Sequence, residues 1–291
     1  MLLYKSGKIS ANQLSCVKCV APYNFSAHTT YGVGGKAKVA YLPNTLLQAK
    51  AVYDSVIKQK IPFVVIGNGS NVLVSDKGFV GVVISTSKLC GIIRAGENTL
   101  FCLAGTKISN LLKYCKKHNL SGLEYLTGIP ATIGGAAFMN AGVGGVAIGD
   151  NIESVRIYNG KTIVLNNSQC NFAYRYSIMR DITPLILGIT LRVNTSDTQT
   201  IEERLRYYSE RRLHLPKGKS CGCVFKNPAG FSAGYLIDAC GLKGKCVGEA
   251  VVSEKHANFI LNYGSSAEDI KKLINKVKDS VSEKFGIKLQ E

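Results

Sequence analysis

Acidic residues are scarce in this sequence. Its 291 residues include 36 lysines and arginines but only 19 aspartates and glutamates, so the formal net charge is +17. Such a chain attracts anions, and the anion can be a nucleic acid or a small nucleotide. The basic residues are spread along the chain, however, and motifs that interleave aromatic and basic residues for nucleic-acid recognition are absent. The charge therefore favours a nucleotide, and we predict no nucleic-acid partner.

A secretion signal and a membrane span are also missing. Residues 1–31 contain no apolar segment followed by a small-residue cleavage site. The only long uncharged stretch, residues 125–149, is diluted by glycines, Pro130 and polar side chains, which a membrane span would not carry in such number. We therefore expect a cytoplasmic protein that has no membrane partner.

Cysteines are numerous but lack the spacing of a zinc site. Of the ten, only Cys16 with Cys19 and Cys221 with Cys223 are close in sequence, and about 200 residues separate the two pairs. We predict no metal site. Most of the cysteines should be reduced, buried and act as small hydrophobic residues.

The chain is long enough for two domains of mixed helix and strand. Apolar runs predict strands at 61–67, 80–86, 100–104, 153–158, 162–165 and 184–193, and helical spacing predicts helices at 45–57 and 107–118. The polar residues 195–200 are either a linker or a helix N-terminus. A last helix should begin at a capping box of Ser265 and Glu268. The predicted buried faces are Leu46, Ala49, Val52, Tyr53, Val56 and Ile57 in the first helix; Ile108, Leu111, Leu112 and Cys115 in the second; and Ile270, Leu273, Ile274, Val277, Val281 and Phe285 in the last.

The most informative segment is an uncharged glycine window at residues 128–145. It holds six glycines and one proline in eighteen residues. Glycine lets backbone N–H groups approach a ligand closely, so the window suits a phosphate-bearing cofactor. A glycine-rich turn region without a ligand is the alternative.

Two other loops suit the oxygens of a pyrophosphate. Residues 29–35 read Thr-Thr-Tyr-Gly-Val-Gly-Gly before a strand-like run, and residues 65–73 read Val-Ile-Gly-Asn-Gly-Ser-Asn-Val-Leu after a buried strand. Both are rich in N–H donors and small polar side chains. Neither matches the GxGxxG fingerprint that opens a helix, so a Rossmann site is not supported.

Two polar segments carry reactive side chains. Residues 172–177 place Arg175 between two tyrosines, which is either an amphipathic surface strand or a guanidinium that receives a carboxylate or phosphate. Residues 222–228 bring Cys223 close to Lys226 and Asn227. Near a lysine, the Cys223 thiol could donate a proton or act as a nucleophile. The alternative is that the segment is only a structural turn.

Taken together, these segments resemble the UDP-N-acetylenolpyruvoylglucosamine reductase family of flavoenzymes. The resemblance runs from residue 28 to residue 289 and includes Gly-Leu-Glu-Tyr-Leu-Thr-Gly-Ile-Pro at 122–130 and His-Ala-Asn-Phe-Ile at 256–260. Each motif alone is a modest signal, but their shared order and spacing are specific. The short connection after Arg175 is similar to the shorter family type, which lacks an extra tyrosine-bearing loop.

The resemblance implies an α+β fold class. A two-subdomain FAD-binding fold of the vanillyl-alcohol-oxidase/PCMH type would occupy residues 1–195, with subdomains at about 20–86 and 87–195. A C-terminal α+β substrate-binding domain would occupy residues 196–291.

The activity that the resemblance implies is the reduction of UDP-N-acetylglucosamine-enolpyruvate to UDP-N-acetylmuramate. NADPH would reduce FAD, and reduced FAD would pass a hydride to the methylene carbon of the enolpyruvyl ether. An enolate-like intermediate would then be protonated at the carbon that bears the ether oxygen. This reaction belongs to peptidoglycan synthesis and so to cell wall biogenesis, cell shape, the cell cycle and cell division, and we expect a monomer.

The resemblance also assigns roles to residues. Arg175 would stabilise the substrate carboxylate, and Cys223 stands where the family usually has a proton-donating serine. Tyr174, Lys226 and Asn227 would contact the UDP sugar. The expected FAD contacts are backbone groups or small polar side chains: Thr30, Gly34, Gly35, Gly67, Asn68, Gly69, Ser70, Asn71, Gly128, Gly134, Gly135 and Asn140, with Gly134, Gly135 and Asn140 near the pyrophosphate.

The sequence departs from the family pattern at two positions. Cys223 replaces serine, although an ordinary thiol, with a pKa of about 8.5, is mostly protonated at neutral pH and can donate a proton. The family's catalytic glutamate lies three residues after the equivalent of Leu289, whereas this sequence stops at Glu291. We expect either a chain truncated before that glutamate, which we favour, or a Glu291 that acts one position out of register.

Other interpretations stay open. A related flavin oxidase with the same cofactor fold, or a non-catalytic nucleotide-binding or nucleic-acid-binding protein, would share part of the pattern. Arg211 and Arg212 either reach the substrate phosphates or form an exposed helix end. His256 is either a structural histidine, the reading we favour, or a ligand.

Overall fold

The computed structural model describes residues 17–291. Cys16 and most of the segment examined for a secretion signal lie outside these described residues. The chain forms two compact units. Unit 1 comprises the described residues up to Tyr23, Lys38–Asn68 and Val80–Arg211, and unit 2 comprises Asn24–Ala37, Gly69–Phe79 and Arg212–Glu291. The predicted boundary at 195/196 separates a FAD-binding domain from a substrate-binding domain, and this assignment of ligands stays a prediction.

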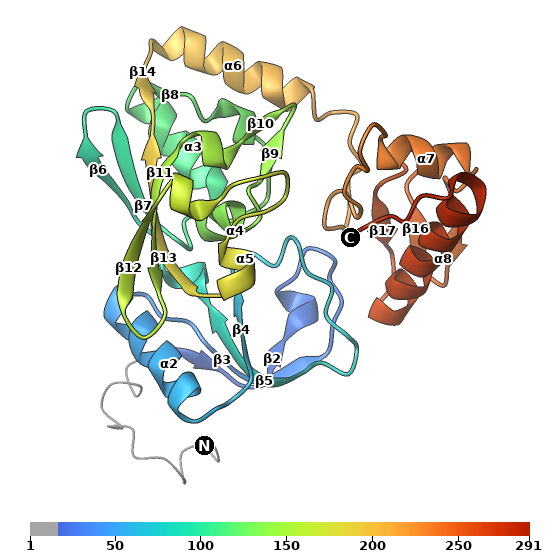
Figure 1. Cartoon of the computed structure of the whole chain (residues 1–291), viewed down its shortest axis with the longest axis horizontal. Coiled ribbons are helices and arrows are strands. Elements are labelled where there is room, and N and C mark those ends of the chain that lie inside the picture. Colours follow the sequence, from blue (N-terminus) through green and yellow to red (C-terminus); the bar gives the residue numbers. More distant parts are fainter. Residues whose placement is uncertain (1–16) are drawn as a thin grey trace. The chain divides into compact units, whose positions relative to one another are not determined.

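Two five-stranded sheets form the frame of unit 1 (Figure 1). The first has the order β1-β3-β5-β4, with β2 also beside β3 and with β4 and β5 parallel. The second has the order β12-β11-β13-β7-β6 and is antiparallel throughout. The strands are β1 (Cys19–Val20), β2 (Tyr23–Asn24), β3 (Lys36–Tyr41), β4 (Phe63–Ile66), β5 (Phe79–Ser85), β6 (Ile92–Gly96), β7 (Thr99–Leu103), β11 (Ile152–Tyr158), β12 (Thr162–Asn166) and β13 (Leu185–Arg192). Two short pairs, β8 (Leu120–Ser121) with β14 (Asn194–Thr195) and β9 (Gly142–Val143) with β10 (Val146–Ala147), complete the strands of this unit.

The helices that the structure describes in unit 1 are α2 (Leu46–Lys58), α3 (Ile108–Lys117), α4 (Ile133–Phe138), α5 (Met179–Ile182) and α6 (Thr198–Glu210). Two of them, α2 and α3, were predicted from their apolar spacing. All four predicted residues of α3 are buried, whereas Ile57 of α2 is 50% exposed. The stripe predicted for α2 was therefore one residue too wide, because Ile57 lies in the last turn, at the edge of the buried face.

Two segments without a helical apolar spacing also form helices. Asp197 accepts a hydrogen bond from the Thr200 amide and caps α6, so residues 195–200 contain a helix N-terminus, one of the two predicted alternatives. The glycine window contains α4, whose cap is Thr132. A six-residue helix within a glycine-rich segment was not predicted, since glycine disfavours helix interiors.

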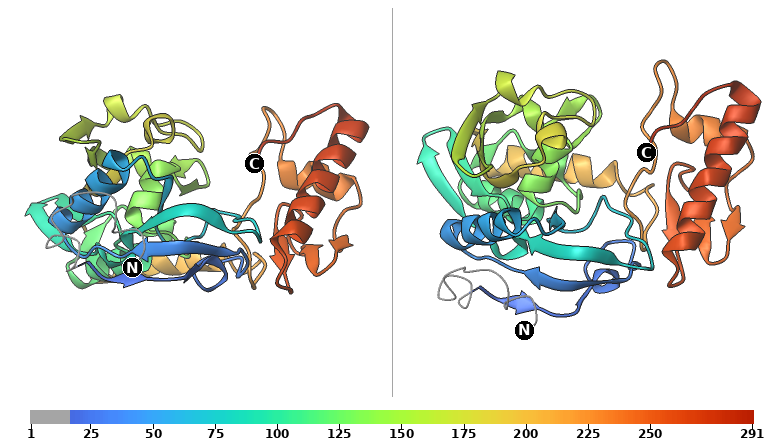
Figure 2. Two further views of the ribbon diagram at one scale, coloured as in Figure 1. Left: turned by 90° about the horizontal axis from the view of Figure 1, so that it is seen from below. Right: turned by 60° about the horizontal axis from the view of Figure 1, so that its bottom comes forward.

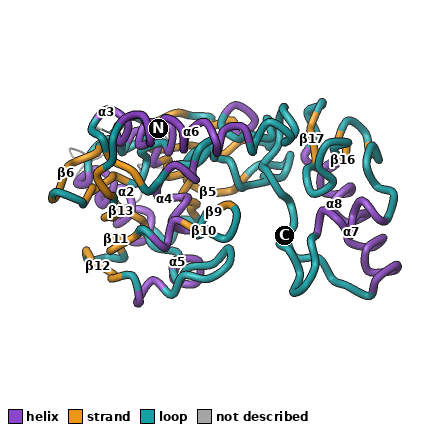
Figure 3. Tube along the Cα trace, turned by 90° about the horizontal axis from the view of Figure 1, so that it is seen from above, coloured by secondary structure: helices purple, strands orange, loops and turns teal. Residues whose placement is uncertain are grey.

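In unit 2, α8 packs against a three-stranded sheet and α7 packs against α8 (Figures 2 and 3). Its elements are β15 (Cys246–Val247), β16 (Ala250–Val252), β17 (Ile260–Asn262), α7 (Ala233–Ala239) and α8 (Ala267–Phe285). The predicted stripe of α8 is buried except for Phe285, which is 38% exposed at the end of the helix. The cap is Ser266 rather than Ser265, because the Ser266 hydroxyl accepts from the Asp269 amide at 3.1 Å, so the predicted capping box was wrong by one residue.

The prediction for the cysteines was only partly right. Within residues 17–291 the nine cysteines are all free, and Cys102, Cys115 and Cys170 are buried as expected. Four others are exposed, because they lie in turns or on edge strands: Cys19, Cys90, Cys223 and Cys246. No helix in the described part of the chain is both long and apolar enough to cross a membrane.

Candidate functional site

In unit 1, the end of β4 meets the glycine window. The side-chain amide of Asn68 donates to the Pro130 carbonyl at 2.8 Å. A Cβ atom on Gly67 would lie 2.3 Å from the Thr132 hydroxyl, so only glycine fits there. The structure thus brings Gly67 and Asn68 together with the segment that contains Gly128, Gly134 and Gly135.

The amides at the start of α4 are already bonded within the protein. The Gly134 N–H donates to the Ala104 carbonyl at 2.8 Å, and the Gly135 N–H donates to the Thr132 hydroxyl at 3.3 Å. These two groups are therefore not free donors for a phosphate. A contact of Gly134 or Gly135 with FAD would have to be a packing contact, and it stays a prediction.

Arg175 lies in a tight turn rather than in the surface strand that was one alternative. The amides of Ala173 and Tyr176 each donate to the other residue's carbonyl at 3.1 Å, so Tyr174 and Arg175 form the tip of the turn. The Arg175 guanidinium donates to the Gly142 carbonyl at 3.1 Å and lies 5.4 Å from the centre of the Tyr174 ring. Arg175 thus contacts the glycine window directly.

In unit 2, the loops 29–35 and 69–79 lie side by side. The Thr30 amide donates to the Gly69 carbonyl at 3.0 Å, and the Gly35 amide donates to the Ser75 carbonyl at 2.9 Å. A Cβ atom on Gly69 would lie 2.2 Å from the His28 carbonyl oxygen. The predicted contacts Thr30, Gly34, Gly35, Gly69, Ser70 and Asn71 therefore form one local cluster in this unit.

The loop after β4 offers a row of free amide donors. Within residues 17–291, the backbone N–H groups of Asn68, Gly69, Ser70 and Asn71 donate to no acceptor of the chain. Successive unpaired N–H groups in a turn form a concavity that binds anions. This donor set fits the phosphates of a dinucleotide such as FAD.

The Cys223 segment runs beside the chain around Asn258 in unit 2. Cys223 is exposed and forms an antiparallel bridge with Phe259. The buried Asn258 side chain accepts from the Phe225 amide and donates to the Phe225 carbonyl, both at 2.9 Å. These two hydrogen bonds fix the backbone of Phe225, two residues after Cys223.

The residues beside Cys223 are held by local hydrogen bonds. The Lys226 amide donates to the Gln290 carbonyl at 2.7 Å, which places the last residues of the sequence beside Lys226. The Asn227 side chain accepts from the Ala233 amide at 3.0 Å, at the start of α7. Glu291 forms an ion pair with Lys278 at 3.0 Å on the surface, and its catalytic role stays a prediction.

The environments of Arg212 and His256 differ from each other. Burial lowers the pKa of the Arg212 guanidinium, and the charge of Cys223 acts in the opposite direction. His256 accepts from the Asn258 amide at 3.2 Å and packs edge-on against Phe259. His256 thus has contacts typical of a structural histidine. Arg211 ends α6 and contacts Tyr207, as expected of a helix end.

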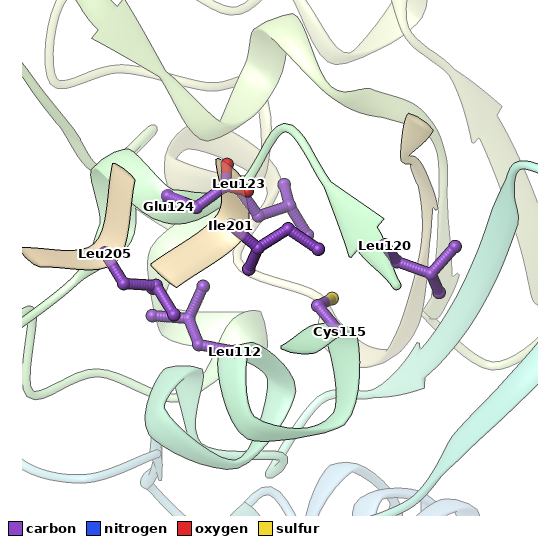
Figure 4. A pocket seen from close by; sticks show the side chains of 7 residues that line it. All are labelled: Leu112, Cys115, Leu120, Leu123, Glu124, Ile201 and Leu205. Atoms are coloured by element: carbon purple, nitrogen blue, oxygen red, sulfur yellow. The ribbon is translucent and has the colours of Figure 1, made fainter. Parts of the chain in front are cut away.

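The pocket in Figure 4 belongs to none of these clusters. It lies between α3, the 3-10 helix at Glu124–Leu126 and α6, and the side chains that line it are Leu112, Cys115, Leu120, Leu123, Glu124, Ile201 and Leu205. One Glu124 oxygen accepts from the Gly122 amide at 2.8 Å, and the other has no partner among the described residues. Within residues 17–291 no group of three or more His, Cys, Asp or Glu side chains is placed to hold a metal ion.

Sequence reasoning missed two residues that shape these clusters. No separate role was predicted for Asn258, although a polar residue between Ala257 and Phe259 in an apolar run signals a buried hydrogen-bonding role. Arg180 was not considered. Its guanidinium donates to the Arg175 carbonyl at 2.8 Å, a contact that no local pattern reveals.

Comparisons with known proteins cover most of the chain. A family model described as "UDP-N-acetylenolpyruvoylglucosamine reductase, C-terminal domain" matches residues 214–291, and a model described as "FAD binding domain" matches residues 37–166. Reductases of that name from Caldanaerobacter subterraneus subsp. tengcongensis and Clostridium botulinum strain 657 are 36% and 40% identical over 270 and 273 residues. Each alignment covers 90% of this chain, and they cover 88% and 87% of the relatives.

A solved structure is similar over nearly its whole length. The crystal structure of UDP-N-acetylenolpyruvylglucosamine reductase from Thermus caldophilus is 34% identical, with a TM-score of 0.80, and the match covers 94% of this chain and 97% of that one. These matches confirm the predicted α+β fold class, with a FAD-binding domain and a C-terminal domain. They also show that the protein is a flavin-dependent oxidoreductase by family. The chain belongs to the UDP-N-acetylenolpyruvoylglucosamine reductase family.

Proposed function

We propose that this protein uses NADPH and FAD to reduce the enolpyruvyl ether of UDP-N-acetylglucosamine-enolpyruvate to UDP-N-acetylmuramate, a step of peptidoglycan synthesis. The observation that carries the proposal is family membership along nine-tenths of the chain. The free amides at 68–71 and the exposed Cys223 support it, because the reaction needs a site for phosphates and a proton donor. Peptidoglycan synthesis links the protein to cell shape and division, and we propose that it acts as a cytoplasmic monomer.

The proposed FAD contacts are the residues of the glycine-rich loops. The amides of residues 68–71 would bind phosphate oxygens, and Thr30, Gly34, Gly35 and the glycine window would pack against the cofactor. Bound FAD supplies the hydride that reduces the substrate. The proposed FAD-binding domain spans residues 1–195, and the proposed substrate-binding domain spans residues 196–291.

Arg175 and Cys223 would do the chemistry that belongs to the protein. The Arg175 guanidinium would bind the substrate carboxylate and stabilise the negative charge that develops next to it. The Cys223 Sγ would hold the proton that the substrate carbon receives. Tyr174, Lys226 and Asn227 would orient the UDP sugar. Glu291 would act only as a further polar group of the substrate site.

The experiment separates the two half-reactions. The purified protein should carry the visible absorbance of oxidised flavin, NADPH should bleach it, and the enolpyruvyl UDP sugar should restore it. In the Cys223→Ala variant we expect bleaching by NADPH at the native rate and slow restoration by the sugar nucleotide. Cys246→Ala, which removes another exposed thiol of unit 2, is the matched control and should behave as the native protein.

Two results would contradict the proposal. A colourless protein that binds no added FAD would exclude a flavin reductase. A flavin that NADPH does not bleach, but that oxygen reoxidises after reduction by an alcohol, would favour a related oxidase instead.

A further inference from the structure

The backbone at Arg175 has a conformation that arginine rarely adopts. Its φ is +54°, in the left-handed region. Arg175 is the third residue of the turn that the Ala173 and Tyr176 hydrogen bonds close, and a positive φ at this position ordinarily calls for glycine or asparagine. A side chain that is kept in spite of this strain is typical of a functional site, provided that the surroundings hold the conformation.

Two side chains hold this turn from opposite ends. Arg180 donates from Nη1 to the Arg175 carbonyl at 2.8 Å, which fixes the peptide that follows Arg175. Asn140 donates from Nδ2 to the Ala173 carbonyl at 2.9 Å, which fixes the peptide before Tyr174. The Oδ1 atom of Asn140 accepts from the Gly149 amide at 2.9 Å, so both polar atoms of this buried side chain are used.

The conformation of this turn determines where the Arg175 guanidinium lies. With its backbone fixed, Arg175 donates to the Gly142 carbonyl and lies over the Tyr174 ring. The residue after the turn is also bonded to the glycine window, because the Ser177 hydroxyl donates to the Phe138 carbonyl at 2.8 Å. The glycine window therefore supports the Arg175 turn at Phe138, Asn140 and Gly142.

We propose that Asn140 and Arg180 are positioning residues for Arg175. They hold its turn in the left-handed conformation and so direct the guanidinium toward its ligand, and neither needs to contact that ligand. The proposal rests on the proposed function, in which Arg175 binds the substrate carboxylate. The predicted contact of Asn140 with the FAD pyrophosphate stays a prediction, and the positioning role rests on the two hydrogen bonds that its side chain already makes.

The first test does not depend on activity. Arg180→Met should lower the melting temperature of the native protein by about 2–4 °C, because the strained turn loses a hydrogen bond that holds it. The carbonyl that Arg180 binds belongs to the backbone, so an Arg175→Gly background keeps this bond and the same substitution should lower the melting temperature there too. An unchanged melting temperature in Arg180→Met would overturn the proposal, whatever the activity of the variant.

The second test uses the holoenzyme. Asn140→Asp keeps the acceptor for Gly149 but removes the donor to Ala173, and Arg180→Met removes the donor to Arg175. Each should slow reoxidation of the flavin by the enolpyruvyl UDP sugar about 10-fold to 100-fold, as expected when a substrate-binding group is misplaced. Reduction by NADPH should stay at the native rate, and Arg180→Lys should restore part of the loss.

A double variant separates positioning from general damage. If Arg180 acts through Arg175, Arg175→Ala with Arg180→Met should be no slower than Arg175→Ala alone. The matched control is Arg94→Met, which removes a guanidinium bond to the Glu97 carbonyl of similar length at another turn and should leave both half-reactions unchanged.

The outcomes distinguish the two proposals. Additive losses in the double variant, or equal losses in both half-reactions, would overturn positioning by Arg180 and Asn140. A native protein that the enolpyruvyl sugar does not reoxidise would instead overturn the proposed function, and the melting-temperature comparison would still decide whether the two side chains hold the turn.

Discussion

The proton donor that we propose, Cys223, is a thiol, whereas the family resemblance implies the hydroxyl of a serine at this position. A donor works only while it carries its proton, and a thiol loses its proton at a lower pH than a hydroxyl does. We therefore expect flavin reoxidation by the sugar nucleotide to slow at alkaline pH in the native protein. In the Cys223→Ser variant this alkaline loss should be absent.

Single-turnover reoxidation rates measured from neutral to alkaline pH check this expectation. NADPH reduction over the same pH range serves as the internal control, because Cys223 is not proposed to act in it. The same alkaline loss in the native protein and in Cys223→Ser would show that another group donates the proton.

Burial of His256 should make the stability of the protein depend on pH. Burial is the main cause that lowers its pKa, and repulsion by His214 contributes. Between the lowered value and the ordinary value of about 6.5, the unfolded chain binds more protons than the folded chain. The free energy of unfolding should therefore fall as the pH drops below about 6.5.

Denaturant unfolding at a series of pH values measures this effect. His256→Gln cannot titrate, so its stability should depend less on pH across the acidic range. His118→Gln, at the exposed end of α3, is the control and should keep the native slope. An unchanged slope in His256→Gln would assign the acid sensitivity to other groups.

At the scale of the element, α8 depends on a residue far from it in sequence. The Asp76 carboxylate accepts from the Ala267 amide at 2.9 Å and from the Glu268 amide at 3.1 Å, and Ser266 accepts from the next amide. These bonds satisfy N–H groups that a helix cannot satisfy itself, and the negative charge suits the helix N-terminus. Asp76→Ala should therefore cost about 1–2 kcal/mol of stability.

Denaturant unfolding measures that cost, and Asp279→Ala is the matched control. Asp279 lies on the exposed face of the same helix, so its loss should change the free energy of unfolding by less than about 0.5 kcal/mol. Equal effects of the two substitutions would show that Asp76 does not cap α8.

The elements that sequence predicted well are those with local causes. The apolar spacing of α3 and α8 and the runs of β11 and β13 were read correctly, because burial of one face or of a whole strand leaves a periodic pattern. The start of α8 was misplaced by one residue, and Asp76 was not found, since its contact spans about 190 residues. The Arg175 turn was missed because no turn rule favours arginine at a positive φ.

At the scale of the whole molecule, sequence reasoning assumed domains that are continuous in the chain. Unit 2 contains two segments from the first eighty residues, and Tyr31 and Val33 belong to its hydrophobic core. The Asn262 side chain donates to the Tyr31 carbonyl at 2.8 Å, which ties one of these segments to β17. Long-range contacts of this kind are invisible to local periodicity, although the residues of the candidate clusters were named from their motifs.

The net charge of +17 should act on the encounter with anionic substrates. Charge attraction raises the association rate and is screened by salt, over about 10 Å at 0.1 M ionic strength. We expect the second-order rate constant for flavin reduction by NADPH to fall steadily as NaCl is added, while the limiting rate at saturating NADPH stays constant.

A charge-reversal variant tests the origin of this salt effect. Lys271 and Lys272 are exposed on α8. Changing both to glutamate lowers the net charge of +17 by four and alters no residue of the candidate clusters. If the overall charge steers NADPH, this variant should associate more slowly at low salt and should approach the native rate at high salt, where screening removes the difference. If association is equal in the two proteins at low salt, the attraction comes from basic residues close to the binding site, and the excess charge of the chain serves another purpose.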